Sequence, residues 1–168
     1  MADITRDRAP ARRGNPAAGL VLRLVELLDR VPAWLLGLLA RLSIADVFWR
    51  SGQTKVDGFS IAPSTFALFE EEYKVPLLPP HLAAYLATIA EHLFPALLVI
   101  GLASRFSALG LLFMTLVIQT FVYPESWPDH ILWISILLTI AARGPGALSL
   151  DHLIARRHRE AAERRAAT

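Results

Sequence analysis

The sequence contains no cysteine among its 168 residues. Thiol–disulfide exchange, iron–sulfur ligation and covalent haem attachment are therefore excluded within this chain. The Walker, Rossmann and zinc-protease motifs are also missing. Of the five histidines, only His81 and His130 match in depth along the predicted helices, so a haem held by two histidines is not favoured. We predict no metal site, and the residues by themselves require no cofactor.

Charged residues are missing from a long stretch in the second half of the chain. Residues 106–123 form an 18-residue run without a charge or a proline. At ~1.5 Å per residue, a helix of this length covers most of a ~30 Å hydrocarbon core. Hydrophobic residues make up 54% of the chain, whereas soluble domains have roughly 45–50%. The composition predicts an integral membrane protein.

Four apolar segments predict four membrane-spanning helices, at roughly 31–51, 81–101, 106–123 and 127–143. The connection between the first two contains Pro63, which can start a short helix bearing Phe66, Phe69 and Tyr73 on one face. Residues 19–30 are amphipathic and either lie in the headgroup plane or pack against the bundle. We predict an all-α, four-transmembrane-helix bundle with an N-terminal amphipathic interfacial helix and a short helix in the loop between spans 1 and 2.

This reading divides the chain into three parts. Residues 1–30 form a basic cytoplasmic segment with the amphipathic helix, residues 31–146 form the membrane domain, and residues 147–168 form a basic cytoplasmic tail. The first part includes Arg6, Arg8, Arg12 and Arg13.

Charge is distributed unequally between the predicted loops. Arginines gather in the N-terminal segment and after Arg143, whereas the two opposite loops hold Lys55 and Lys74 beside six acidic residues. The positive-inside rule therefore predicts that both termini are cytoplasmic. For the basic tail, anionic lipid headgroups are a nearer partner than RNA, so we predict contact with membrane lipid and none with nucleic acid.

Several ionisable side chains fall inside the predicted spans. A charge near the bilayer centre costs at least ~2.5 kcal/mol, so such residues usually face partners or water. Counting from the helix ends puts Arg41 and Glu91 at a similar depth, and we predict that they pair. Five further groups count to the outer half of their helices and predict a polar interior that opens outward: Asp46, Arg50, Lys55, Gln119 and His130. The candidate ligand-binding residues are Arg41, Asp46, Trp49, Arg50, Lys55, Glu91, His92, Gln119 and His130. The alternative is that these groups only neutralise one another and fix helix register.

Three segments resemble the DoxX family of small four-helix membrane proteins. They are Arg41-Leu-Ser with Phe48-Trp-Arg-Ser-Gly-Gln-Thr-Lys55, then Glu91-His-Leu-Phe-Pro through Gly101-Leu-Ala-Ser-Arg105, then Trp133 with Arg143-Gly-Pro-Gly-Ala-Leu-Ser-Leu-Asp151. The resemblance covers roughly residues 35–154 and implies a four-span protein of the bacterial inner membrane. In some members it implies an association with quinone-linked sulfur oxidation or with membrane complexes against oxidative stress. It carries over no catalytic residue. The positions that carry it are Arg41, Gly52, Lys55, Glu91, Gly101, Arg105 and Asp151.

Three functions follow as expectations. The first is an accessory or anchor subunit of a quinone-linked redox complex, with quinone as the implied cofactor and a membrane protein as partner. The second is a carrier or binding protein for a small solute or metal ion, using Asp46, Glu91 and His92. The third is a scaffold whose acidic outer loop docks a partner. Whether the chain is an enzyme and whether it forms a homo-oligomer stay open.

Overall fold

The computed structural model describes residues 16–167. In chain order its elements are α1 (Pro16–Asp29), α2 (Ala33–Gln53), β1 (Val56–Asp57), β2 (Ser60–Ile61), α3 (Pro63–Glu71), α4 (Pro80–Ile100), α5 (Ser104–Phe121), the 3₁₀ turn η1 (Pro124–Ser126), α6 (Trp127–Arg143) and α7 (Leu150–Ala166). The protein is therefore all-α, apart from one small hairpin. The predicted spans and the short helix after residue 62 are all found as helices. The arginines at positions 6, 8, 12 and 13 lie outside the described residues.

The described residues divide into two compact units between Pro32 and Ala33. The first unit contains α1, whose leucines and valines are largely exposed. The apolar side of α1 is therefore not buried against other described residues.

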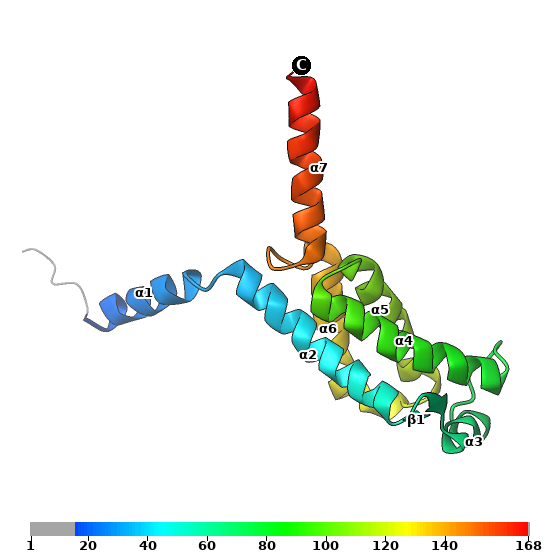
Figure 1. Cartoon of the computed structure of the whole chain (residues 1–168). Helices are drawn as coiled ribbons and strands as arrows, with labels where there is room; N and C mark the ends of the chain where they lie inside the picture. Colours follow the sequence, from blue (N-terminus) through cyan, green and yellow to red (C-terminus); the bar gives the residue numbers. More distant parts are fainter. Residues whose placement is uncertain (1–15, 168) are drawn as a thin grey trace, which may run out of the picture. The chain divides into compact units, whose positions relative to one another are not determined.

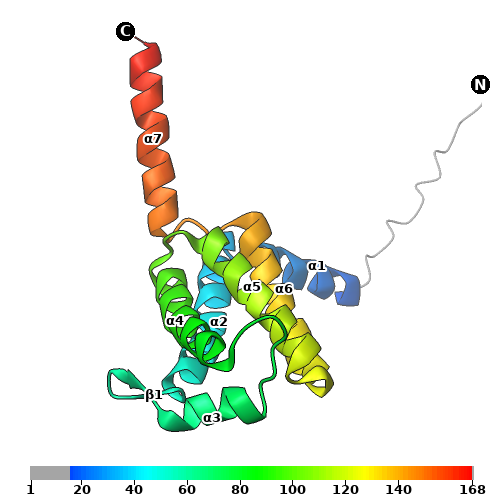
Figure 2. The same ribbon diagram turned by 90° about the vertical axis from the view of Figure 1, so that its right-hand side faces the viewer.

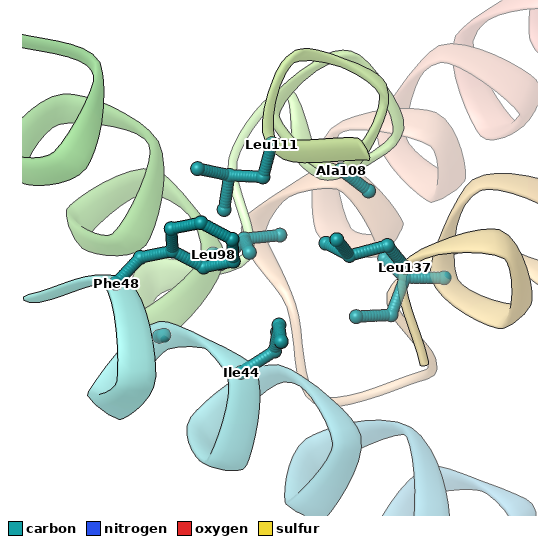
Figure 3. Packing of buried hydrophobic residues seen from close by; sticks show 8 residues of the cluster. Ile44, Phe48, Leu98, Ala108, Leu111 and Leu137 are labelled. Atoms are coloured by element: carbon teal, nitrogen blue, oxygen red, sulfur yellow. The ribbon is translucent and has the colours of Figure 1, made fainter. Parts of the chain in front are cut away.

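In the second unit, α2, α4, α5 and α6 share one hydrophobic core. Figure 3 shows side chains from all four helices pointing toward one another. The buried members are Ile44, Ala45 and Phe48 of α2, Leu98 of α4, Ala108 and Leu111 of α5, and Leu137 and Ile140 of α6. Each helix contributes apolar side chains to this core, as expected for packed helices.

A two-stranded antiparallel hairpin and α3 fill the connection between α2 and α4. Gly58 takes a φ of +59° at the first position of the hairpin turn, a conformation that favours glycine. Phe69 of α3 packs on Ala83 and Ala84, in the first turns of α4. The hairpin and α3 therefore lie at one end of the four helices, and α7 begins at the other (Figures 1 and 2).

Helix α7 was not predicted from the sequence, which indicated only a basic tail for residues 147–168. Ser149 is its N-cap, and its Oγ accepts a hydrogen bond from the backbone N–H of His152 at 3.1 Å. A serine followed by a helix-forming, charged run is a recognisable start signal. The signal was present in the sequence.

Among residues 16–167, two helices are long and apolar enough to cross a membrane by themselves, namely α4 and α5. The segment Gly19–Asp29 of α1 and helix α2 meet the same criteria only when taken together, as a broken span or a re-entrant loop. Helix α2 carries Arg41, Asp46 and Arg50, and α6 has only 17 residues. The chain is a helical membrane protein with two or three candidate spans by this measure.

Candidate functional site

A small chamber lies at the α3 end of the four helices. It has a volume of about 140 Å³ and is lined by Val47, Phe48, Ser51, Lys55, Tyr73, Glu91, Ile118, Tyr123, His130 and Trp133. Three of its ionisable groups, Lys55, Glu91 and His130, are at most 5% exposed, whereas Tyr73 and Tyr123 are half-buried. The chamber exceeds the space that one water requires, but is smaller than the ~300–1,000 Å³ of pockets that bury drug-sized ligands.

Lys55 and Glu91 form a buried ion pair on one wall of the chamber. The Lys55 Nζ lies 2.7 Å from Oε2 and 3.0 Å from Oε1 of Glu91. Ser51 Oγ donates to Oε1 at 3.1 Å and accepts from Lys55 at 3.0 Å. Glu91 Oε2 makes the ion-pair contact but no well-directed hydrogen bond. One carboxylate oxygen is therefore left able to accept a further proton donor.

His130 of α6 also lines the chamber, and Gln119 of α5 holds its ring in place. The Gln119 Nε2 donates to the Pro124 carbonyl at 2.7 Å, which leaves Gln119 Oε1 facing His130 Nδ1 at 2.6 Å. Because that oxygen can only accept, Nδ1 carries the proton of the neutral imidazole and His130 Nε2 has a free lone pair. No group among residues 16–167 bonds to His130 Nε2.

Two tyrosines connect the chamber to the protein surface. The Tyr123 hydroxyl lies 2.6 Å from Glu72 Oε1 and 2.9 Å from the Tyr73 hydroxyl. One hydroxyl has one proton, and a carboxylate only accepts, so Tyr123 donates to Glu72 and Tyr73 donates to Tyr123. Burial raises the pKa of Tyr123 above its ordinary value, and the bond to Glu72 adds to this, so the hydroxyl stays protonated.

A larger open groove, of about 940 Å³, lies on the other side of the contact between α2 and α4. Trp49 and His92 line it, with ring centroids 5.2 Å apart. His92 is already satisfied, since Nδ1 lies 2.7 Å from the Thr88 carbonyl and Nε2 lies 3.0 Å from Gln53 Nε2. A Cβ at Gly52 would meet the His92 ring at 2.8 Å, so the two helices approach closely between groove and chamber.

Asp46 and Arg50 belong to neither space. The Arg50 Nε lies 2.9 and 2.8 Å from the two carboxylate oxygens of Asp46, one turn earlier on α2. Both side chains are largely exposed on the outer face of the helix.

The predicted pair of Arg41 and Glu91 is wrong. Arg41 is buried, but its Nη1 donates to the Leu98 carbonyl at 2.9 Å and its Nη2 to the carbonyl of Leu148. Equal counting from the helix ends assumed that α2 and α4 begin and end at the same level. The first turns of α4 pack on α3 instead, so Glu91 lies beside Gly52 of α2. Arg41, eleven residues earlier, is then displaced by about 16 Å along the helix axis.

A model of the DoxX family matches residues 36–124, which is more than half of the chain. The chain belongs to the DoxX family. It is also 30% identical over 127 residues to an uncharacterized protein of Haemophilus influenzae, covering 70% of this chain and 82% of that protein. No solved structure matches the chain.

The seven positions that carry the DoxX resemblance separate into two clusters at opposite ends of the helices. Gly52, Lys55 and Glu91 belong to the chamber end. The other four, Arg41, Gly101, Arg105 and Asp151, gather where α4, α5, α6 and α7 meet.

The second cluster of this DoxX chain provides hydrogen-bond partners for backbone groups at the ends of helices. Arg41 bonds the last carbonyls of α4, and Arg105 Nη1 donates to those of Ala141 and Ala142 in α6 at 2.7 and 2.9 Å. The Asp151 carboxylate accepts from the backbone N–H groups of Ala103 and Ser104 at 2.8 Å each, at the start of α5. Terminal N–H and C=O groups lack partners within their own helix, so this cluster has a structural role.

Of the nine predicted site residues, Lys55, Glu91 and His130 line the chamber, and Gln119 orients His130. Trp49 and His92 line the groove, Asp46 and Arg50 are exposed, and Arg41 lies in the other cluster. Sequence reasoning missed Ser51, Tyr73, Tyr123 and Trp133 as chamber residues. Tyr73 and Tyr123 lie just beyond the ends of α3 and α5, and this was a usable signal, since a tyrosine hydroxyl that leaves water needs a hydrogen-bond partner. Among residues 16–167, no group of three or more His, Asp or Glu side chains is placed to hold a metal ion.

Proposed function

We propose that this DoxX protein crosses the bacterial inner membrane four times, through α2, α4, α5 and α6, with both termini in the cytoplasm. The shared core of these four helices supports this, because a helix that contributes to the core lies alongside its neighbours. Helix α2 carries too many charges to qualify as a span by hydropathy alone, but each of the three charged side chains has a partner. Arg41 bonds the last carbonyls of α4, and Asp46 pairs with Arg50. The α7 end is rich in arginine and the α3 end is acidic.

In this topology α1 lies in the cytoplasmic headgroup region. Its exposed apolar residues include Leu20, Leu24 and Leu28, and Arg23, Glu26 and Arg30 provide a polar side. A helix of this kind binds the membrane surface through its apolar face and through attraction of arginine to anionic lipid.

The chamber is then a ligand site near the outer surface, and the observation that carries its function is the arrangement of unused acceptors around it. Glu91 Oε2 contacts only Lys55 and keeps a lone pair that can accept a further donor, and His130 Nε2 has a free lone pair. The donors of Lys55 are already directed at Ser51 and Glu91. The chamber is therefore suited to a small ring that donates hydroxyl protons. A quinol has two such hydroxyls, and the two acceptors can take the protons that its oxidation releases.

We therefore assign the protein a role as an accessory or anchor subunit of a quinone-linked redox complex, in which it holds the quinol head group. A quinone supplies the redox chemistry when bound, and an electron acceptor in a partner subunit completes it. The enclosed volume of about 140 Å³ accommodates a head group of one ring rather than a larger cofactor.

Binding of short-chain quinols to the protein in lipid nanodiscs tests this assignment. In a variant with Trp34, Trp49 and Trp127 changed to Phe, the fluorescence of Trp133 reports on the chamber, because Trp133 lines it. We expect the quinol to bind about tenfold more tightly than the matching quinone, which is ~1.4 kcal/mol. The matching quinone has carbonyl oxygens in place of the two hydroxyls, so it cannot donate hydrogen bonds to Glu91 and His130.

The matched control is a pair of histidine variants. His130→Phe should weaken quinol binding about tenfold, whereas His92→Phe, on the groove side, should leave it unchanged. Equal binding of quinol and quinone, or a larger effect of His92→Phe, would contradict the assignment. If a small amine or alcohol binds and neither quinol nor quinone does, the solute-carrier function takes first place.

The exposed pair on α2 supports a protein partner. Asp46 lies two turns inside the proposed span, and a carboxylate facing lipid tails at that depth is costly. We infer that another membrane helix, from a complex partner or from a second copy of this chain, covers Asp46 and Arg50. Since the chain has no cysteine, the single thiol of Asp46→Cys can carry a thiol-reactive photo-cross-linker, which should link the protein to that partner. Absence of any cross-linked species in native membranes argues against this surface.

A further inference from the structure

The chamber has a hydrogen-bonded connection to the outer surface that its ligand contacts do not use. Tyr73 and Tyr123 both line the chamber, and their hydroxyls are 2.9 Å apart. Tyr123 is also bonded at 2.6 Å to Glu72, whose side chain is exposed. The chain of groups therefore starts at the wall of the chamber, in which His130, Lys55 and Glu91 are buried, and ends at a carboxylate in contact with solvent.

We propose that Tyr73, Tyr123 and Glu72 form the path by which protons leave the chamber for the outer surface. The proposal takes the chamber as the site assigned above, but the path itself needs no ligand to operate.

The hydrogen-bond donors and acceptors of the two tyrosines are arranged for proton transfer from the chamber toward Glu72. Tyr73 donates to Tyr123, and Tyr123 donates to Glu72, so both hydroxyl protons already point outward. A proton from the chamber binds the Tyr73 oxygen, the Tyr73 proton moves to the Tyr123 oxygen, and the Tyr123 proton moves to Glu72. Glu72 then releases a proton to water. One proton has crossed, both tyrosines are neutral again, and rotation of the two hydroxyls restores the starting arrangement.

The source of the proton is the set of ionisable groups facing the chamber. His130 of α6 faces Gln119 of α5, with Asp129 next to it in sequence, and the pair of Lys55 and Glu91 closes the α2 and α4 side. The chamber exceeds the ~10–15 Å³ needed for one water. In the proposed path, water in the chamber connects His130 Nε2 to the Tyr73 hydroxyl, and proton transfer through water is an accepted route between acid–base groups.

Proton exchange at His130 can be measured without a ligand. The His130 and Trp133 rings have centroids 4.9 Å apart, and an imidazolium quenches a neighbouring indole more strongly than a neutral imidazole does. In the variant whose only tryptophan is Trp133, a laser-induced pH jump should give a fluorescence relaxation at the rate of His130 protonation. His130→Phe should remove this signal, which identifies its origin.

We expect Tyr123→Phe and Tyr73→Phe to slow the relaxation at least tenfold with its amplitude unchanged. Each substitution removes one hydroxyl and keeps the ring that packs in the wall. Tyr85→Phe is the matched control, because Tyr85 lines the groove and not the chamber, and it should leave the rate unchanged. Glu72→Gln should also slow the relaxation. Because the Glu72 side chain is exposed, this substitution should leave the fold unchanged.

Rates within twofold of the parent in Tyr123→Phe and Glu72→Gln would overturn the path, since water would then reach the chamber directly. A parent protein without any pH-dependent Trp133 signal between about pH 5 and 9 would also overturn it, because His130 would not exchange protons with the outside. Either result can occur while quinol still binds, so failure of the path and failure of the proposed function are distinguishable.

Discussion

At the scale of single residues, the pairing of Lys55 with Glu91 decides the chemistry of the outer end. Both groups are buried, and they form an ion pair with each other at 2.7 Å. Glu91→Gln should leave Lys55 charged and unpaired, which typically costs ~3–5 kcal/mol when a buried pair is broken. Thermal or denaturant unfolding in detergent measures this loss. The double variant Lys55→Met with Glu91→Leu should recover most of it, because no uncompensated charge then remains.

The control for this residue-scale prediction is an ion pair of similar length that is exposed to water. Arg156 and Glu160 are bonded at 2.8 Å on α7 and both are largely exposed. Glu160→Gln should change stability by at most ~0.5 kcal/mol. A Glu91→Gln protein as stable as the Glu160→Gln protein would mean that Lys55 is not confined by the chamber.

At the scale of elements, the turn between α4 and α5 is where helix ends are tied together. Gly101 has a φ of +74°, and a Cβ there would meet the Arg41 guanidinium and lie 2.8 Å from the Ser149 backbone. Gly101→Ala should therefore cost stability twice, through the left-handed conformation at ~1–2 kcal/mol and through overpacking at ~1–3 kcal/mol. The measurement is again the free energy of unfolding.

Gly146 provides the matched element-scale control. It has a φ of +84°, but a Cβ there would meet its nearest neighbour at an ordinary 3.5 Å. Gly146→Ala should cost only the conformational part. If the two alanine variants lose the same stability, the close approach of Arg41 and Ser149 to the turn has no energetic weight.

At the scale of the whole molecule, the topology can be tested with single cysteines, since the chain has none of its own. Phe59 at the hairpin tip and Ala161 on α7 are both exposed and lie at opposite ends of the proposed spans. A membrane-impermeant maleimide should label Phe59→Cys in spheroplasts and Ala161→Cys only after lysis, because the arginine-rich end stays in the cytoplasm. Labelling of both from one side would contradict four spans.

The sequence by itself determined the helices. Their positions follow from apolar runs, prolines and charge, which act within a few residues of one another. The predicted last span, 127–143, coincides with α6, and the short helix after residue 62 begins where Pro63 allows it. The family could also be recognised, because its motifs are local. Helix α7 was missed although its cap was visible.

Only the tertiary structure decided which polar groups meet. The partner of Glu91 depends on the offset between α2 and α4, and that offset is set by α3 packing under the first turns of α4. The offset cannot be found by counting residues along the chain, so the sequence prediction paired Glu91 with Arg41 and gave Lys55 no partner. Tyr73 and Tyr123 are 50 residues apart, and their hydrogen bond exists only because α3 and the end of α5 come together at the chamber. Side-chain contacts of this range depend on how whole helices pack, and no local pattern encodes them.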